Sequence, residues 1–241
     1  MDELNVRNLF SATLFDTYPS FVPTQALYLD LEGRQNGSED VLSLYWPRKS
    51  SSDRFSWLKR TLDVGLCLER FLDHLQSIDA GNAKWVVVYS AGGEEPEERQ
   101  RLIDLFGEDP VPNLDWINLH FAVQKCQPMK ASIRSNRNVW HCRDRSRVRY
   151  SLEALEWEFG INRPNSIRSH SNCYKDADGA PGEMEVLSLV QKSIDGLASE
   201  QEDLTLRQYC EADVKNMFGI SNTSEQTIFS RDERRSRRRS G

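Results

Sequence analysis

The first half of the chain carries apolar runs of the length and composition of buried β-strands. Residues 26–33 (ALYLDLEG) predict a strand that ends at a glycine turn, and residues 41–46 (VLSLYW) predict the strand that returns after a polar hairpin loop. Residues 84–89 (KWVVVY) form an unbroken, largely β-branched run, which is typical of a central strand buried on both faces. A further short strand is expected near residues 55–58.

Apolar residues at helical spacing become dominant later in the chain. They predict amphipathic helices at about residues 65–78, 96–106, 151–159, 183–197 and 203–218. Residues 116–123 are expected to form a strand or a short helix. Because a hairpin comes first and a helix precedes the central strand, this order predicts an α/β fold with a mixed sheet flanked by helices, rather than a doubly wound parallel sheet.

The helix expected at residues 151–159 has a clear apolar side. It starts at Ser151 and is closed by Gly160. Leu152 and Leu155 are expected on its inner side, and Glu153 and Glu156 on its outer side.

The length of 241 residues fits one large domain with short appendages. Residues 1–24 are expected to be a lead-in that packs against the domain, and residues 25–220 the domain itself. Residues 221–241 end in RDERRSRRRSG and are expected to be a basic, disordered tail.

The composition is that of a soluble globular protein, with 38% hydrophobic and 28% charged residues. No apolar run has the length of a membrane span, and the start of the chain lacks the pattern of a signal peptide. The five cysteines are scattered without a CxxC pair, which indicates reduced thiols and a cytoplasmic protein. The four histidines do not fall at metal-ligand spacings either, so any bound metal would be held by carboxylates.

The formal net charge of −6 hides an uneven distribution of charge. Between residues 130 and 149 there are seven lysines and arginines and a single acid. Arg143, Arg145 and Arg147 within this segment are candidates for binding the phosphate backbone of a nucleic acid, with affinity that is independent of sequence and sensitive to salt. A solvated loop is the alternative interpretation of the same segment.

Asp30 and Glu32 are the most informative pair of acids. Residues two apart on a strand point to the same face, so both carboxylates would project from the end of an otherwise apolar strand. Like charges brought together repel unless a cation lies between them, and oxygen ligands select hard ions such as Mg²⁺ or Mn²⁺. Taken alone, the pair is more often a strand end that reaches solvent. Tyr209 and Asp213 form a second pair, one helical turn apart, and alone they are typical of a surface helix.

The combination of these segments resembles a known family. YLDLEG resembles the first motif of the DEDD 3′–5′ exonuclease superfamily, which is RNase H-like, and YCEADVKNMF resembles the third motif of its tyrosine subclass, Y-x3-D. The segment WVVVYSAGGEEPEERQRLIDLF is similar to the second motif of the predicted-nuclease branch of that superfamily. SLEALEWEFG resembles the helix that precedes the third motif. The resemblance spans about residues 25–218.

The resemblance implies a metal-dependent nuclease, with a 3′–5′ exonuclease acting on single-stranded DNA or RNA as the expected activity. Asp30, Glu32, Glu98 and Asp213 would hold two Mg²⁺ or Mn²⁺ ions about 3.5–4 Å apart, as in other two-metal enzymes. Tyr209 would orient the attacking water.

The assignment of Glu98 rests on its spacing from two leucines, Leu102 and Leu105. Three other glutamates compete with it: Glu94, Glu95 and Glu97. The chain also lacks the N-x-x-F-D phrase of proofreading enzymes. A catalytically inactive relative that binds nucleic acid is therefore the main alternative, and an interaction domain whose acids lie apart on the surface is the third.

Overall fold

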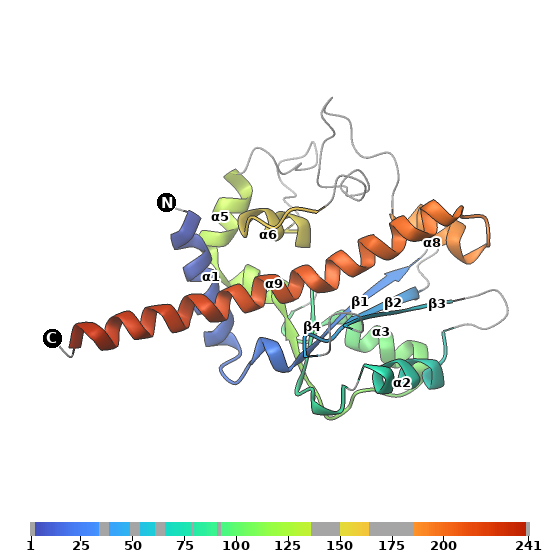
Figure 1. Cartoon of the computed structure of the whole chain (residues 1–241), viewed down its shortest axis with the longest axis horizontal. Helices are drawn as coiled ribbons and strands as arrows, with labels where there is room; N and C mark the ends of the chain where they lie inside the picture. Colours follow the sequence, from blue (N-terminus) through green and yellow to red (C-terminus); the bar gives the residue numbers. More distant parts are fainter. Residues whose placement is uncertain are drawn as a thin grey trace.

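The computed structural model describes residues 3–33, 39–48, 54–60, 66–78, 80–90, 93–135, 150–163 and 186–239, and for residues 3, 39, 80 and 224–239 it describes the backbone only. Within this part of the chain, a five-stranded sheet lies between two layers of helices (Figure 1). None of the described helices is both long enough and apolar enough to cross a membrane.

The sheet is mixed, as the sequence predicts. Its strands are β1 (Ala26–Gly33), β2 (Glu39–Tyr45), β3 (Phe55–Lys59), β4 (Trp85–Val88) and β5 (Asp115–Asn118), in the order β3-β2-β1-β4-β5. β1 pairs antiparallel with β2, and β2 with β3, whereas β1–β4 and β4–β5 are parallel pairs. Every residue of β4 is buried, which confirms it as a central strand.

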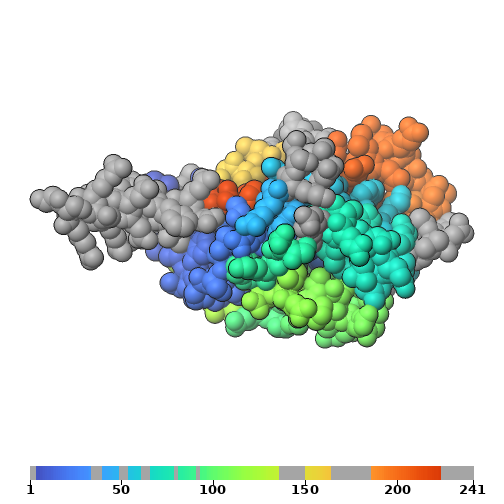
Figure 2. All heavy atoms as spheres, turned by 60° about the horizontal axis from the view of Figure 1, so that its bottom comes forward, coloured from blue at the N-terminus to red at the C-terminus, as the bar shows by residue number. Residues whose placement is uncertain are grey.

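Two helices, α2 (Leu68–Ser77) and α3 (Glu97–Phe106), cover one face of the sheet. Figure 2 brings this side of the molecule forward and shows α2 in teal and α3 in green. The other face carries α1 (Glu3–Thr17), α4 (Leu119–Lys125), α5 (Gln127–Ser135), α6 (Leu152–Glu158) and α9 (Glu200–Arg239). α8 (Val186–Ile194) packs against α9 near β2. Single turns of 3₁₀-helix lie at Pro23–Gln25 and Ala80–Asn82.

The alternation of side chains along β1 decides which layer each of its acids faces. Leu27, Leu29 and Leu31 are buried in the cluster beneath α2 and α3. Tyr28 points to the opposite face, where α1 and α9 pack. Residues two apart on a strand share a face, so Asp30 and Glu32 lie on the side of α9.

Two helices were not predicted from the sequence. Residues 3–17, which were expected only as a packed lead-in, form α1, and its fully buried Phe10 and Leu14 join the core beside α9. Their spacing of four residues is the helical signal that the prolines at 19 and 23 obscured. Residues 127–135, for which no element was predicted, form α5.

The last helix is longer than expected. It was predicted to end near residue 218, with a disordered tail from 221, whereas the backbone of α9 is helical to Arg239. No glycine or proline lies between residues 221 and 239 to interrupt it.

The start of α9 is fixed by a capping box between Ser199 and Glu202. The Ser199 hydroxyl accepts from the backbone N–H of Glu202 at 3.3 Å, and the Glu202 carboxylate accepts from the Ser199 backbone N–H at 2.8 Å. The carboxylate also accepts from Lys192 Nζ at 2.8 Å. Hydrogen bonds from Lys192 and Ser199 lower the pKa of Glu202 to about 2.

Glu202→Gln is therefore expected to lower the melting temperature at neutral pH. Since the folded-state pKa of Glu202 lies below its unfolded value of about 4.3, the stabilisation is fully present above that pH and is lost as the pH falls toward about 2. Melting curves of wild type and variant should thus converge across this window. Glu200→Gln, a change to an exposed acid in the same turn, is the control. A difference in melting temperature that stays constant down to about pH 2 would contradict this role of the cap.

Candidate metal centre

Three of the four predicted metal ligands are brought together. A carboxylate oxygen of Asp30, one of Glu32 and one of Asp213 all lie within 4.8 Å of one another. Asp30 and Glu32 are half-buried near the end of β1, and Asp213 is buried on α9. The two elements are separated by some 180 residues of sequence, so their meeting is a property of the fold.

The way α9 packs on the sheet places Asp213 at the acids of β1. Cys210, Val214 and Met217 are fully buried, and they mark the side of α9 that faces the sheet. Tyr209 and Asp213, one turn apart, lie along the edge of this buried side and are 8% and 5% exposed. The prediction that these two residues share a helix face is confirmed.

The electrostatics of the cluster are strongly unfavourable for isolated anions. Burial raises the pKa of Asp213 well above its ordinary value, the Arg163 guanidinium opposes this shift, and the charges of Asp30 and Glu153 add to it. A cation among these carboxylates would replace the proton that this environment otherwise favours. Burial, and then the charges of Glu32 and Asp30, raise the pKa of Cys210 in the same way. The nearby sulfur is therefore a neutral thiol, and the donor set is made of oxygens.

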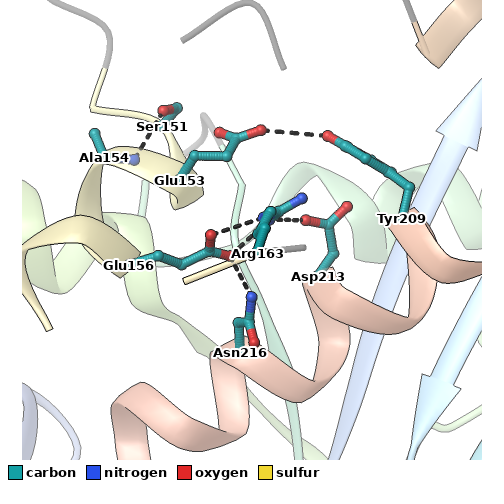
Figure 3. Close-up of polar contacts among 8 residues, drawn as sticks. All are labelled: Ser151, Glu153, Ala154, Glu156, Arg163, Tyr209, Asp213 and Asn216. Carbon is teal, nitrogen blue, oxygen red and sulfur yellow. Dashed lines mark hydrogen bonds and ion pairs between the residues drawn. The ribbon is translucent and has the colours of Figure 1, made fainter. Parts of the chain in front are cut away.

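The buried Arg163 holds Asp213 through a hydrogen bond (Figure 3). Arg163 donates from Nε to Glu156 Oε2 at 2.7 Å and from Nη2 to Glu156 Oε1 at 2.6 Å. Nη2 also donates to Asp213 Oδ1. Asn216 Nδ2, one turn along α9 from Asp213, donates to Glu156 Oε1 at 3.0 Å. Asp213 is thus tied to α6 through Arg163 and Glu156.

Tyr209 is held by a second acid of α6. Its hydroxyl donates to Glu153 Oε1 at 3.3 Å (Figure 3). Burial, and then the charges of Asp213 and Glu153, raise the pKa of Tyr209 well above its ordinary value of 10.0, so the phenol keeps its proton at neutral pH. α6 itself is capped by Ser151, whose hydroxyl accepts from the Ala154 backbone N–H at 3.2 Å.

The two acids of α6 correct the sequence analysis. Glu153 and Glu156 were expected on the outer side of their helix, but they are only 8% and 0% exposed. α6 packs against α9 on the side where solvent was expected, and Arg163 supplies the neutralising charge there. The available signal was the pair of acids three residues apart, followed by an arginine in GINRP. The expected end of this helix at Gly160 is confirmed by its positive φ of 69°.

Glu98 does not join the three clustered carboxylates. It lies in the first turn of α3, on the opposite side of the sheet, where Leu102 is fully buried as its spacing predicts. Its carboxyl group hydrogen bonds to Ser90, just beyond β4, and its Oε2 is buried and has no hydrogen-bond partner among the described residues. Burial raises the pKa of this carboxyl.

The loop that leads to Glu98 is tied to the end of β5. Asn118 Oδ1 accepts from the Ser90 backbone N–H at 3.1 Å, and Asn118 Nδ2 donates to the Gly93 carbonyl at 2.8 Å. The Ser90 hydroxyl accepts from the backbone N–H of Glu97 at 3.1 Å, which fixes the first turn of α3. These bonds hold Glu98 close to the end of β4.

The three competing glutamates are exposed. Glu95 pairs with Arg99 at 2.7 Å, Glu97 lies 3.7 Å from Arg101, and Glu94 lies in the loop before α3. Of the four candidates, only Glu98 is withdrawn from solvent.

The remaining predicted contacts are with nucleic acid. Arg143, Arg145 and Arg147 lie outside the described residues. The ring of Trp116, a type of side chain that can stack on bases, is 8% exposed and belongs to the core. Compared with protein-family models, with curated proteins and with solved structures, the chain gives no significant match.

Proposed function

We propose that this chain is a metal-dependent nuclease with an RNase H-like, DEDD-type fold, and that it hydrolyses phosphodiester bonds as a 3′–5′ exonuclease. The observation that carries the proposal is the meeting of Asp30, Glu32 and Asp213 within 4.8 Å at the end of a central strand. The first and third motifs, identified separately in the sequence, supply these residues. An interaction domain with scattered surface acids gives no reason for this convergence.

The residues fit Mg²⁺ or Mn²⁺ by the chemistry of their donors. All three offer carboxylate oxygens, which hard divalent ions prefer, and their mutual repulsion is relieved by a cation. A second ion would need further acids. Glu98 is the fourth ligand that the motif resemblance implies, and its buried, unpaired Oε2 supports that assignment. Glu153 is the other candidate, because it contacts Tyr209 and adds to the raised pKa of Asp213.

Bound metal ions would supply a water of lowered pKa and stabilise charge on the leaving oxygen. The side chains of the protein position the metal ligand Asp213 and the hydroxyl of Tyr209. Arg163 and Glu156 hold Asp213, and Glu153 holds the hydroxyl of Tyr209. Because Tyr209 keeps its proton at neutral pH, it serves to orient the attacking water and is not the base that deprotonates it.

The test is cleavage of 5′-labelled single-stranded DNA and RNA by the full chain. We expect cleavage with Mg²⁺ or Mn²⁺, products that shorten from the 3′ end, and none in EDTA. Cleavage that persists in EDTA would contradict a metal-dependent mechanism. Binding without cleavage under every metal condition would replace the proposal by the alternative, an inactive protein that binds nucleic acid. The observation that favours this alternative is that Glu98 does not belong to the cluster of the other three acids.

The basic segment provides a separate prediction about substrate binding. Replacing Arg143, Arg145 and Arg147 together by glutamine is expected to weaken binding to all sequences equally. The slope of log affinity against log salt should flatten by about 0.7–0.9 for each phosphate that the variant no longer neutralises. A slope identical to that of wild type would show that these arginines do not touch the backbone.

A further inference from the structure

Arg163 engages one oxygen of the proposed metal ligand Asp213. Its side chain is 0% exposed, and its Nη2 donates to Asp213 Oδ1 while Nε and Nη2 grip both oxygens of Glu156. The guanidinium also lies over the ring of Tyr209, with 5.0 Å from Cζ to the ring centroid. Arg163 is therefore held by Glu156 and by the ring of Tyr209. It cannot move away from Asp213 without breaking its two hydrogen bonds to Glu156.

Stability alone does not account for this arrangement. A buried ion pair is often no more stabilising than a well-packed apolar pair, because both charges must lose their water. In addition, Nη1 of Arg163 is buried and has no hydrogen-bond partner in the part of the chain that the structure describes. Figure 3 shows this nitrogen without a dashed line, on the side of the guanidinium away from Glu156. A buried donor left unpaired is itself unfavourable.

The consequence for Asp213 is a restricted way of binding metal. A carboxylate has two oxygens, and Arg163 donates to Oδ1, where its positive charge disfavours a cation. Oδ2 is then the oxygen better suited to bind a cation. Ca²⁺ takes six to eight oxygens and often binds both oxygens of one carboxylate, whereas Mg²⁺ takes six ligands at shorter distances and usually binds carboxylates through single oxygens.

We propose that Arg163 limits Asp213 to coordination through one oxygen, and that it thereby makes the centre select Mg²⁺ and Mn²⁺ over Ca²⁺. This inference rests on the proposed metal centre and adds a residue that determines its selectivity. Arg163 acts through Asp213, so it is a positioning residue.

The direct test is the double variant Arg163→Met/Glu156→Gln. It removes one positive and one negative charge, so the net charge around the centre is unchanged. The glutamine still offers an amide oxygen to Asn216, and Oδ1 of Asp213 becomes available. Dissociation constants of the full chain for Mn²⁺ and for Ca²⁺ are measured by titration calorimetry, with the fold checked by circular dichroism. We expect the preference for Mn²⁺ over Ca²⁺ to fall by about tenfold, as a second oxygen from Asp213 suits the larger ion.

Glu156→Gln alone is the matched control. It changes the charge of the cluster, so both affinities can change, but Arg163 still holds Asp213. The ratio of the two affinities is expected to stay within about twofold of wild type, because both ions carry the same charge. A ratio that falls as far in this variant as in the double variant would overturn the role of Arg163.

Wild type supplies a measurement that needs no variant to fold. It is expected to bind Mn²⁺ more tightly than Ca²⁺, and equal or tighter binding of Ca²⁺ would overturn the inference. An unchanged ratio in a folded double variant would overturn it as well, while leaving the metal centre in place. If wild type binds neither ion, the proposed metal centre itself is wrong.

Discussion

Asp30→Asn is expected to reduce Mg²⁺- or Mn²⁺-dependent cleavage by a factor on the order of 10³ or more, because it weakens the binding of the metal ions. This factor corresponds to a loss of about 4 kcal/mol of transition-state stabilisation, at tenfold for each 1.4 kcal/mol. Asparagine keeps the shape of the side chain but offers one neutral oxygen in place of a carboxylate. Asp30 contributes to the raised pKa of Asp213, so its charge destabilises the cluster when no cation is present. The melting temperature of the metal-free variant should therefore equal or exceed that of wild type.

The measurement is the initial rate of cleavage of a labelled oligonucleotide, paired with melting curves in EDTA. Asp16→Asn, the same change at an exposed position on α1, is the control and should behave as wild type. Wild-type cleavage by Asp30→Asn would refute the proposed mechanism. Loss of activity together with a large drop in melting temperature would instead assign Asp30 a structural role.

Glu98→Gln is expected to lower the cleavage rate by about 10²-fold or more if Glu98 is a metal ligand, which corresponds to a loss of about 3 kcal/mol or more of charge stabilisation. Glu97→Gln, one position earlier in the same turn, should stay within a few-fold of wild type. Both carboxylates gain similarly from the positive end of the helix, so the dipole cannot distinguish them. The environments of the two carboxylates do distinguish them. Glu97 is exposed near Arg101, whereas Glu98 has a buried oxygen with no hydrogen-bond partner among the described residues.

Glu153→Gln completes this comparison. If Glu153 only positions Tyr209, the variant should lose about tenfold in rate, which corresponds to about 1.4 kcal/mol and is typical of one lost hydrogen bond. A severe loss in Glu153→Gln combined with a mild one in Glu98→Gln would make Glu153 the fourth carboxylate. Mild effects in both variants would contradict a four-carboxylate site.

The strands were predictable because a strand that is buried on both faces appears in the sequence as a run of consecutive apolar residues. The first and central strands lie between neighbours in the sheet, so their sequences are nearly continuous apolar runs, and β1 and β4 appear where those runs predict them. The nearness of Asp30 to Glu32 follows from strand geometry alone. The meeting of this pair with Asp213 needed the motif resemblance, because no local rule links residues so far apart.

The residues that hold Asp213 and Tyr209 in place were not predictable in the same way. Glu153 and Glu156 look like solvent-facing acids, because a helix with one apolar side normally exposes the other. α6 instead packs its acidic side toward α9, and the compensating charge comes from Arg163. That pairing joins residues 7 and 50 positions apart, with a guanidinium that is 0% exposed. The sequence marks this contact only by two acids three residues apart and an arginine that follows them, which does not by itself identify the partners.

The most direct test of the central claim is to locate a bound metal ion. Crystals of the full chain grown with Mn²⁺ would give an anomalous difference map in which the ion can be distinguished from water. We predict a peak among the carboxylates of Asp30, Glu32 and Asp213. Manganese bound elsewhere, with none at these three residues under saturating conditions, would contradict the proposal.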